Sequence, residues 1–164
     1  MSGLVAATGM AALLGSAVVG GVFFAFSSFV MKALARVPSE EGIAAMQSIN
    51  VTVINPGFLV AFVGTAILSL AMAGFALTSW DRPSALYFLA GAIFYVAGTF
   101  LVTGLGNVPL NDQLAAVTNA NATGIDVWEH YLKRWTVLNH LRTAAAIGAA
   151  LMFTKGLLLQ SAAL

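Results

Sequence analysis

One stretch of the chain, Trp128 to Arg142 (WEHYLKRWTVLNHLR), repeats aromatic and polar side chains at helical spacing. On an α-helix, which turns about 100° per residue, a stripe roughly 60° wide carries three rings, an amide and a guanidinium: Trp128, Tyr131, Trp135, Asn139 and Arg142. The apolar run Thr143–Leu159 follows directly. Polar groups in such surroundings are cut off from water and need partners. We therefore expect this stripe to form one wall of a functional site.

Arg142 is the strongest signal in the stripe, because arginine at mid-span costs about 2.5–3.5 kcal/mol. The alternative is that it lies only a few turns inside and extends to the headgroups. Its guanidinium can hold amide oxygens, a substrate oxygen or an acid such as Asp112. Asn139 lies one turn earlier on the same face and is either an interhelical hydrogen bond or a substrate contact. We assign both residues to the candidate catalytic group.

His140 is the third candidate catalytic residue, as the base. It is the only side chain near the polar cluster that readily exchanges a proton near neutral pH. It lies about 100° around the helix from Asn139, beside Thr136 and Lys133, so it cannot share the centre of the stripe. The alternative is a histidine at the lipid interface, or one whose ring is simply hydrogen-bonded within the fold.

Five amide side chains flank the first and third of the three links between apolar segments, and their number favours a hydrogen-bonding pocket for substrate. They are Gln47, Asn50, Asn55, Asn107 and Asn111. Capping is the alternative for Asn55 and Asn107, which precede helix starts, and for Asn111 with Asp112.

Aromatic side chains are expected to supply the apolar walls of the same pocket. We expect Trp135 to stack on the substrate with three rings of the first segment: Phe23, Phe24 and Phe26. An interfacial aromatic belt is the alternative for a single tryptophan. Trp128 and Trp135 are seven residues apart and differ by about 10 Å in depth, so at least Trp135 is expected to face protein or ligand.

The composition sets the fold class. Of 164 residues, 60% are hydrophobic and 8% are charged, against about a quarter charged in soluble domains. We predict an all-α integral membrane four-helix bundle, with short amphipathic helices in the first and third connectors. Residues 1–164 form a single transmembrane domain, with spans at about 4–30, 56–78, 84–105 and 127–159. The N-terminal run is too long for a signal peptide and is expected to be a retained span.

Local signals place the ends of these helices. Ser39 is expected to cap the connector helix, and Asn55 followed by Pro56 to open the second span. Glycines at 104 and 106 favour an end to the third span, with a separate short helix to about 117. Thr123 or Asp126 is expected to cap the fourth span. Two short hairpins put the connectors 32–50 and 106–127, with their amides, on the same side of the membrane.

Charge and residue types exclude several classes of function. The net charge is +1 and the seven basic residues form no patch, so nucleic acid is not an expected partner. The chain has no cysteine. Its two histidines, His130 and His140, lie about 15 Å apart on one helix and cannot share an ion, so no metal is expected. The expected partners are the lipid bilayer and an apolar small molecule, with homo-oligomerisation left open.

Basic residues favour a cytoplasmic connector side, in a bacterial inner membrane. Two of them leave the first span and two open the fourth: Lys32, Arg36, Lys133 and Arg134. Only Arg82 and Lys155 lie at the opposite side.

The chain resembles the anthrone oxygenase-like family, long classed as a domain of unknown function. The resemblance runs in order through nearly the whole sequence, in Gly20–Leu34 (GGVFFAFSSFVMKAL), Ala45–Asn50 (AMQSIN), Asn55-Pro56, Asn107–Asn111 (NVPLN) and Trp135–Thr143 (WTVLNHLRT). Named members are fungal enzymes that oxidise anthrones to anthraquinones with oxygen and no cofactor. The resemblance implies a site lined by Trp135, Asn139, Arg142, Asn107 and Asn111, with Asn50 and Asn55 beside them.

The residues are compatible with that chemistry. An anthrone-type substrate loses an activated proton to give an enolate, which can pass an electron to oxygen without metal or flavin. Such a site needs a base, oxyanion donors and a dry aromatic cavity. We assign these roles to His140, to Arg142 with Asn139, and to Trp135 with its phenylalanine neighbours. A non-catalytic lipid- or quinone-binding or partner-stabilising bundle is the alternative, and a transporter is disfavoured because no span carries a central acid.

Overall fold

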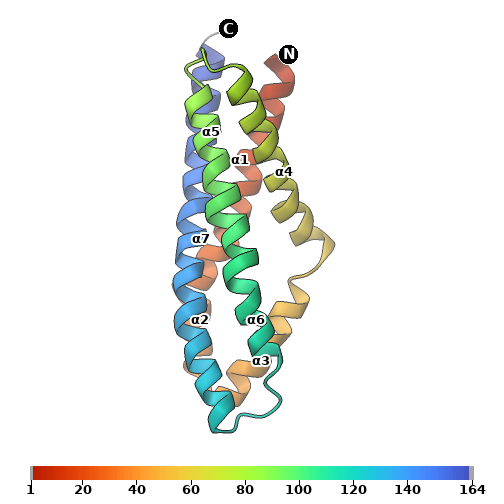
Figure 1. The fold of residues 1–164 in the computed structure, drawn as a ribbon, viewed down its shortest axis with the longest axis vertical. Coiled ribbons are helices and arrows are strands. Elements are labelled where there is room, and N and C mark those ends of the chain that lie inside the picture. The colour runs from red at the N-terminus through yellow and green to blue at the C-terminus, as the bar shows by residue number, and fades with distance from the viewer. Residues whose placement is uncertain (1, 163–164) are drawn as a thin grey trace.

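The computed structural model describes residues 2–162, where helices joined by turns and short loops are the only regular secondary structure, and where Ser2 and Ala162 lie at the same end of the molecule (Figure 1). The first long helix consists of α1 (Ser2–Ala25), the π-helical turn η1 (Phe26–Val30) and α2 (Met31–Leu34). The connector helix α3 (Ser39–Thr52) leads to α4 (Pro56–Thr78). The next long helix is α5 (Ala85–Ile93), η2 (Phe94–Leu101), η3 (Thr103–Asn107) and α6 (Val108–Ala115), and α7 (Ala122–Ala162) closes the bundle.

Four helices in this part of the chain are long and apolar enough to cross a membrane: Gly3–Leu34, Pro56–Thr78, Ala85–Ala115 and Ala122–Ala162. The predicted all-α four-helix membrane bundle is therefore confirmed. With 41 residues, α7 is about 61 Å long, twice the roughly 30 Å hydrocarbon layer. The 23 residues of α4 cover only about 34 Å.

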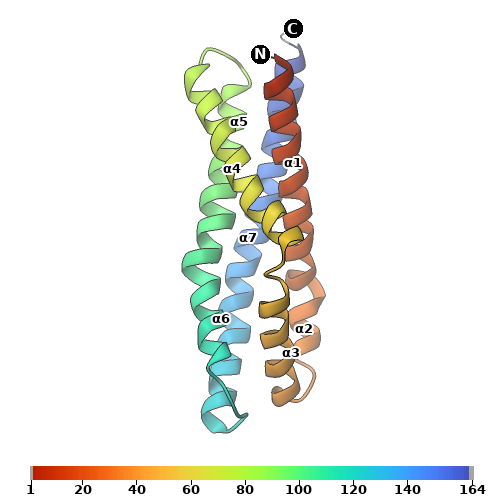
Figure 2. The same ribbon diagram turned by 90° about the vertical axis from the view of Figure 1, so that its right-hand side faces the viewer.

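The molecule consequently has two halves along its long axis (Figure 2). We call the half in which α1 begins and α7 ends the terminus half. There α4 completes the four-helix bundle with α1, α5 and α7. In the other half, here the connector half, α3 lies beyond the start of α4 and packs with α2, α6 and the first part of α7.

The predicted start of the second span is confirmed. Asn55 precedes α4, and its side-chain oxygen accepts from the Phe58 N–H at 3.0 Å, with Pro56 in the first turn. The predicted Ser39 cap of the connector helix is wrong. Ser39 is already the first helical residue, because Pro38 takes the preceding extended position and its carbonyl accepts from the Gly42 N–H.

The third span does not end at glycines 104 and 106, as the sequence predicted. The helix continues to Ala115 through the π-helical turn η3. A widened turn accommodates Pro109, which lacks an N–H to donate. Gly106 lets the Leu138 side chain approach, since a Cβ there would lie 2.9 Å from its Cδ1. Gly106 thus serves packing within a helix, whereas Gly104 has open space at the position of a Cβ.

The fourth span is longer at its start than predicted. It begins at Ala122, and neither Thr123 nor Asp126 caps it. Asn121 does so instead, because its Oδ1 accepts from the Gly124 N–H at 2.9 Å.

Glycines in the terminus half receive aromatic rings from neighbouring helices. A Cβ on Gly91 of α5 would lie 2.9 Å from the Phe153 ring of α7. The Phe153 ring is fully buried in this contact. Gly98 lies equally close to Ala145 of α7. The helices can therefore approach closely without leaving a void.

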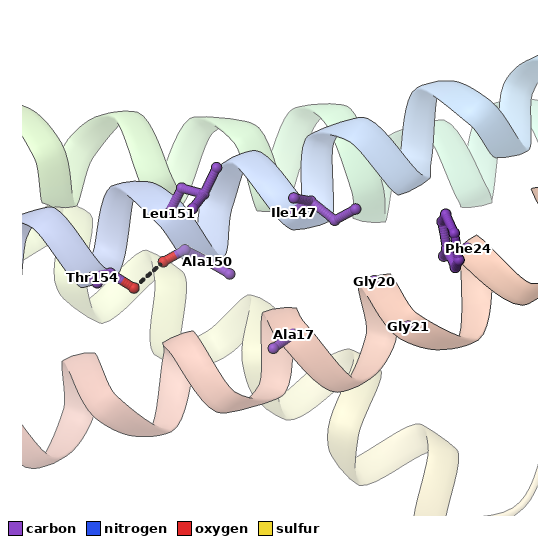
Figure 3. Close-up of a pocket in the computed structure, with 8 residues that line it drawn as sticks. All are labelled: Ala17, Gly20, Gly21, Phe24, Ile147, Ala150, Leu151 and Thr154. Atoms are coloured by element: carbon purple, nitrogen blue, oxygen red, sulfur yellow. Dashed lines mark hydrogen bonds between the residues drawn. The ribbon is translucent and has the colours of Figure 1, made fainter.

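In α1, small residues one helical turn apart form two pairs, Ser16 with Gly20 and Ala17 with Gly21, and only the first pair packs inside the bundle. Ser16 and Gly20 are buried, with Gly20 against Ala146 of α7. Ala17 and Gly21 instead line a shallow apolar groove on the outer face between α1 and α7 (Figure 3). Phe24 stands at one end of this groove, with 55% of its surface exposed.

Candidate functional site

The predicted stripe on α7 is buried along its whole length. Trp128 is 2% exposed, and the four residues that follow at helical spacing are equally enclosed: Tyr131, Trp135, Asn139 and Arg142. The first three rings form a ladder, with centroids 5.8 and 5.9 Å apart. Trp128 also lies against Gly42 of α3. Both tryptophans therefore face protein, not an aromatic belt at the membrane surface.

Arg142 is buried at the junction of the two halves, with only 4% of its surface exposed. Its guanidinium carbon lies 4.1 Å from the centroid of the Phe23 ring and 4.9 Å from that of Trp135. Nη2 donates to Asn139 Oδ1 at 2.7 Å and Nη1 to Thr103 Oγ1 at 3.3 Å, whereas Nε has no acceptor. The side chain therefore does not extend to the headgroups.

The charge on Arg142 has no carboxylate beside it. All six acidic side chains of the protein are exposed, including Asp112, the predicted partner. Two aromatic faces and two neutral oxygens surround the guanidinium instead. A buried cation in such surroundings is costly unless an anion joins it, so its environment favours a negatively charged ligand.

Asn139 connects Arg142 to the first helix. Its Nδ2 lies 2.8 Å from the Phe23 carbonyl and 2.7 Å from Ser27 Oγ, and donates to both. Ser27 in turn contacts Thr143 Oγ1 at 3.0 Å. The interhelical role predicted as one alternative for Asn139 is thus present. The amide is fully buried and holds the guanidinium in place.

A cavity of about 270 Å³ opens beside Arg142, between the first helix, α3, α4 and η3. Five rings contribute to its wall: Phe23, Phe26, Phe58, Phe62 and Trp135. Four polar side chains join them: Asn50, Thr103, Asn111 and Arg142. Ile54 and Leu59 also line it, and both are exposed on the outer surface where α3 meets α4. The cavity is therefore aromatic, polar on one side, and open toward the outside of the bundle.

A second polar network supports the wall below Arg142. Asn111 Oδ1 accepts from Trp135 Nε1 at 2.9 Å and from the Tyr131 hydroxyl at 2.8 Å. Asn50 Nδ2 donates to the same hydroxyl at 3.3 Å. Asn111 is thus not a helix cap but an acceptor for the aromatic stripe. The structure brings Asn50, Asn111 and Trp135 together, as predicted.

Three other predicted amides lie outside the cavity wall. Gln47 donates to the Leu114 carbonyl of α6 at 2.8 Å and to the Val117 carbonyl just after α6 at 2.9 Å, and so joins the two connectors. Asn55 is exposed and caps α4. Asn107 is buried and caps nothing, and its amide donates to the Trp135 carbonyl at 3.2 Å. All three shape the connector half without touching the cavity.

Phe24 and His140 also point away from the cavity. Phe24 faces the outer groove, so only Phe23 and Phe26 of the three predicted phenylalanines line the cavity. His140 is exposed, because the 100° step from Asn139 turns it to the outside of α7. Its predicted role as base does not fit this position.

The structure also shows site residues that sequence reasoning missed. Thr103 and Ser27 touch the guanidinium and its supporting amide, yet each sits among small and apolar residues with no motif of its own. Tyr131 was part of the predicted stripe, but its place between two amides depends on how the connectors fold. Within residues 2–162, no three His, Cys, Asp or Glu side chains converge.

A comparison with protein families gives a match for this chain. A family model described as anthrone oxygenase matches residues 52–152, well over half of the sequence. The matched part holds the whole aromatic stripe with Asn107 and Asn111, whereas Asn50 lies just before it. Neither the curated proteins nor the solved structures include a significant match. Because this match covers more than half of the sequence, the chain belongs to the anthrone oxygenase family.

Proposed function

We propose that this protein is a membrane-embedded oxygenase that oxidises an apolar, anthrone-like substrate to a quinone in the cavity beside Arg142. The observation that carries the proposal is a buried guanidinium without a carboxylate partner at the wall of an aromatic cavity. An anthrone is flat and apolar, and it acquires a negative oxygen when it loses a proton. Such an anion supplies the charge that the site lacks.

The chemistry follows from the stabilisation of that anion. Loss of a proton from the activated CH₂ group gives an enolate, whose charge rests mainly on the former ketone oxygen. Donors from Arg142 aimed at this oxygen favour the enolate over the neutral ketone. The enolate passes one electron to O₂, and the two radicals join at the ring carbon as a peroxide. Loss of water then leaves the quinone, so that one O₂ is consumed and one H₂O is released.

No histidine lines the cavity to take the proton that the substrate loses. Arg142 is the only ionisable side chain among the residues that line the cavity, and it is a poor base. We infer that water or hydroxide entering the cavity removes the proton and that Arg142 makes this step easier by stabilising the product anion. The same reaction needs no metal or organic cofactor, because the enolate itself reduces oxygen.

An apolar substrate is proposed to enter sideways from the bilayer, through the mouth between Ile54 and Leu59. From Arg142 to the end of α7 at Ala162 the helix rises about 30 Å, the thickness of the hydrocarbon layer. The cavity then lies near one face of that layer. The greater number of basic residues in the connector half supports a cytoplasmic position for that half, in a bacterial inner membrane.

The test is oxidation of anthrone by the purified protein in lipid nanodiscs. Quinone absorbance and oxygen uptake are followed together, and we expect both to exceed the empty-nanodisc rate with one O₂ consumed per quinone formed. Rates equal to the empty control would contradict the proposal. A non-catalytic quinone-binding role is the second candidate, favoured by the absence of a base among the lining residues. It predicts saturable quinone binding without turnover.

A further inference from the structure

Trp135 fixes the orientation of two asparagine amides at the cavity wall. An indole N–H can only donate, so its contact at 2.9 Å identifies the Asn111 atom as the carbonyl oxygen. The Tyr131 hydroxyl gives its single proton to that oxygen, at 2.8 Å. The hydroxyl oxygen can then only accept from Asn50, and the Asn50 atom 3.3 Å away must be the amide nitrogen.

One polar atom of each amide is left without a partner. Asn111 Nδ2 has no acceptor and Asn50 Oδ1 has no donor among the described residues. Both side chains line the cavity. Neither atom is among the unpaired atoms that are sealed from solvent in this part of the chain, which are Ser69 Oγ, Asn107 Oδ1 and Arg142 Nε. The wall therefore offers a reachable donor and a reachable acceptor.

We propose that Asn50 and Asn111 recognise a neutral hydroxyl group on the aromatic ligand. A hydroxyl is the smallest group that both donates and accepts. It would accept from Asn111 Nδ2 and donate to Asn50 Oδ1. The inference rests on the proposed function, in which Arg142 takes the ionised oxygen. It adds that these two amides hold a free hydroxyl of the ligand, one that is not bonded to the ligand's own ketone.

The two asparagines thereby become specificity-determining residues. A ligand without the hydroxyl leaves both amide atoms unpaired, whereas a matched ligand satisfies them in one contact. Because the cavity is open on one side and water can reach the amides, we expect a preference of about tenfold and not a complete exclusion.

Three quinones of similar size test the proposal: anthraquinone, 1-hydroxyanthraquinone and 2-hydroxyanthraquinone. The hydroxyl of the 1-isomer bonds to its own carbonyl, whereas that of the 2-isomer is free. Binding to the whole protein in nanodiscs is followed by quenching of tryptophan fluorescence, at a mildly acidic pH that keeps the phenol neutral. We expect the 2-isomer to bind about tenfold more tightly than the other two. Asn50→Leu reduces this ratio to within about twofold.

Asn119→Leu is the matched control, since this asparagine is exposed on the loop before α7. It keeps the tenfold ratio. Equal binding of the three quinones by the unchanged protein, or an unchanged ratio in Asn50→Leu, would overturn the inference. Anthrone turnover is measured in parallel. A protein that prefers the 2-isomer but oxidises no anthrone supports the recognition pair and contradicts the proposed oxygenase, so the two failures are distinguishable.

Discussion

The terminus half and the connector half use the same long helices but fill the space between them differently. In the terminus half, a ring such as Phe153 meets a glycine on the facing helix, and the helices close on each other. In the connector half, the rings of Tyr131 and Trp135 carry polar hydrogens that need acceptors, and the acceptor Asn111 stands beside a cavity. Glycine-facing rings thus close the terminus half, whereas rings hydrogen-bonded to an asparagine amide support a wall of the cavity in the connector half.

Irregular helical turns mark the level where the two halves meet. η1, η2 and η3 all contact α7, and each contributes a side chain that hydrogen-bonds to Arg142 or Thr143 near its middle. Thr103 in η3 donates to the Thr99 carbonyl at 2.8 Å while it accepts from Arg142. Widened turns of this kind are frequent at functional sites. Here they lie where a polar wall must be fitted into otherwise regular helices.

The substitution Arg142→Met is expected to have the largest effect. It tests whether the connector half, and not the terminus half, carries the catalytic function. Loss of the only positive group at the cavity should lower kcat/KM for anthrone by about a thousandfold, since transition-state charge loses its main stabiliser. Stability should change by no more than about 1 kcal/mol, because an unpaired buried charge is removed together with its hydrogen bonds. Quinone formation and thermal unfolding in detergent measure the two effects.

The matched control is Arg82→Met, at the exposed turn between α4 and α5. It should leave both quantities as they are. If Arg142→Met retained more than a tenth of the activity, the guanidinium would not be the oxyanion donor, and the polar wall of the connector half would have only a structural role.

Phe153→Ala is the corresponding change in the terminus half. This ring is fully buried against Gly91, and its removal leaves a cavity that should lower the free energy of unfolding by about 3 kcal/mol. Turnover by the folded protein should stay within about twofold, because Phe153 is about three helical turns from Arg142 on α7. Phe29→Ala, which removes an exposed ring, is the control for stability. An equal loss in both variants would mean that glycine–ring packing does not stabilise this half.

Asn139→Leu should affect both halves, because this amide lies where they join. It removes one hydrogen bond each from the Phe23 carbonyl, Ser27 and Arg142. Ser27 keeps its contact with Thr143, and Arg142 keeps the one with Thr103. We expect a loss of about 2 kcal/mol in stability and about tenfold in kcat/KM. Ser27→Ala removes only one of the three contacts and should cost less in both assays. The opposite order of the two variants would contradict the supporting role of Asn139.

Periodicity and apolar length were enough to predict part of this architecture from sequence. They gave the four spans and the buried stripe, and Asn55 followed by Pro56 gave the start of α4. They failed where a local signal had a tertiary use. Gly106 and Pro109 normally favour a helix end, yet here the widened turn and the approach of Leu138 keep the helix continuous.

Contacts between helices decided what the sequence left open. Phe23 and Phe24 are adjacent in an aromatic run, so no periodicity could tell which ring faces the cavity. Packing against α7 places Phe23 under the guanidinium and leaves Phe24 outside. Thr103 and Ser27 could be recognised as site residues only once η1, η3 and α7 were known to meet at Arg142.

His140→Ala is the smallest expected effect and tests how the proton leaves. A general base contributes about 10²–10⁴ to a rate, so loss of a true base would be obvious. His140 is exposed on the outside of α7, next in sequence to the fully buried Asn139. We therefore expect kcat/KM for anthrone to stay within about twofold of the unchanged protein. A loss of a hundredfold would return His140 to the reaction, and would require the outer face of α7 to reach the substrate. Suppose that kcat/KM is unchanged in His140→Ala and falls as expected in Arg142→Met. The connector half then acts by stabilising an anion, and none of its side chains has to move the proton.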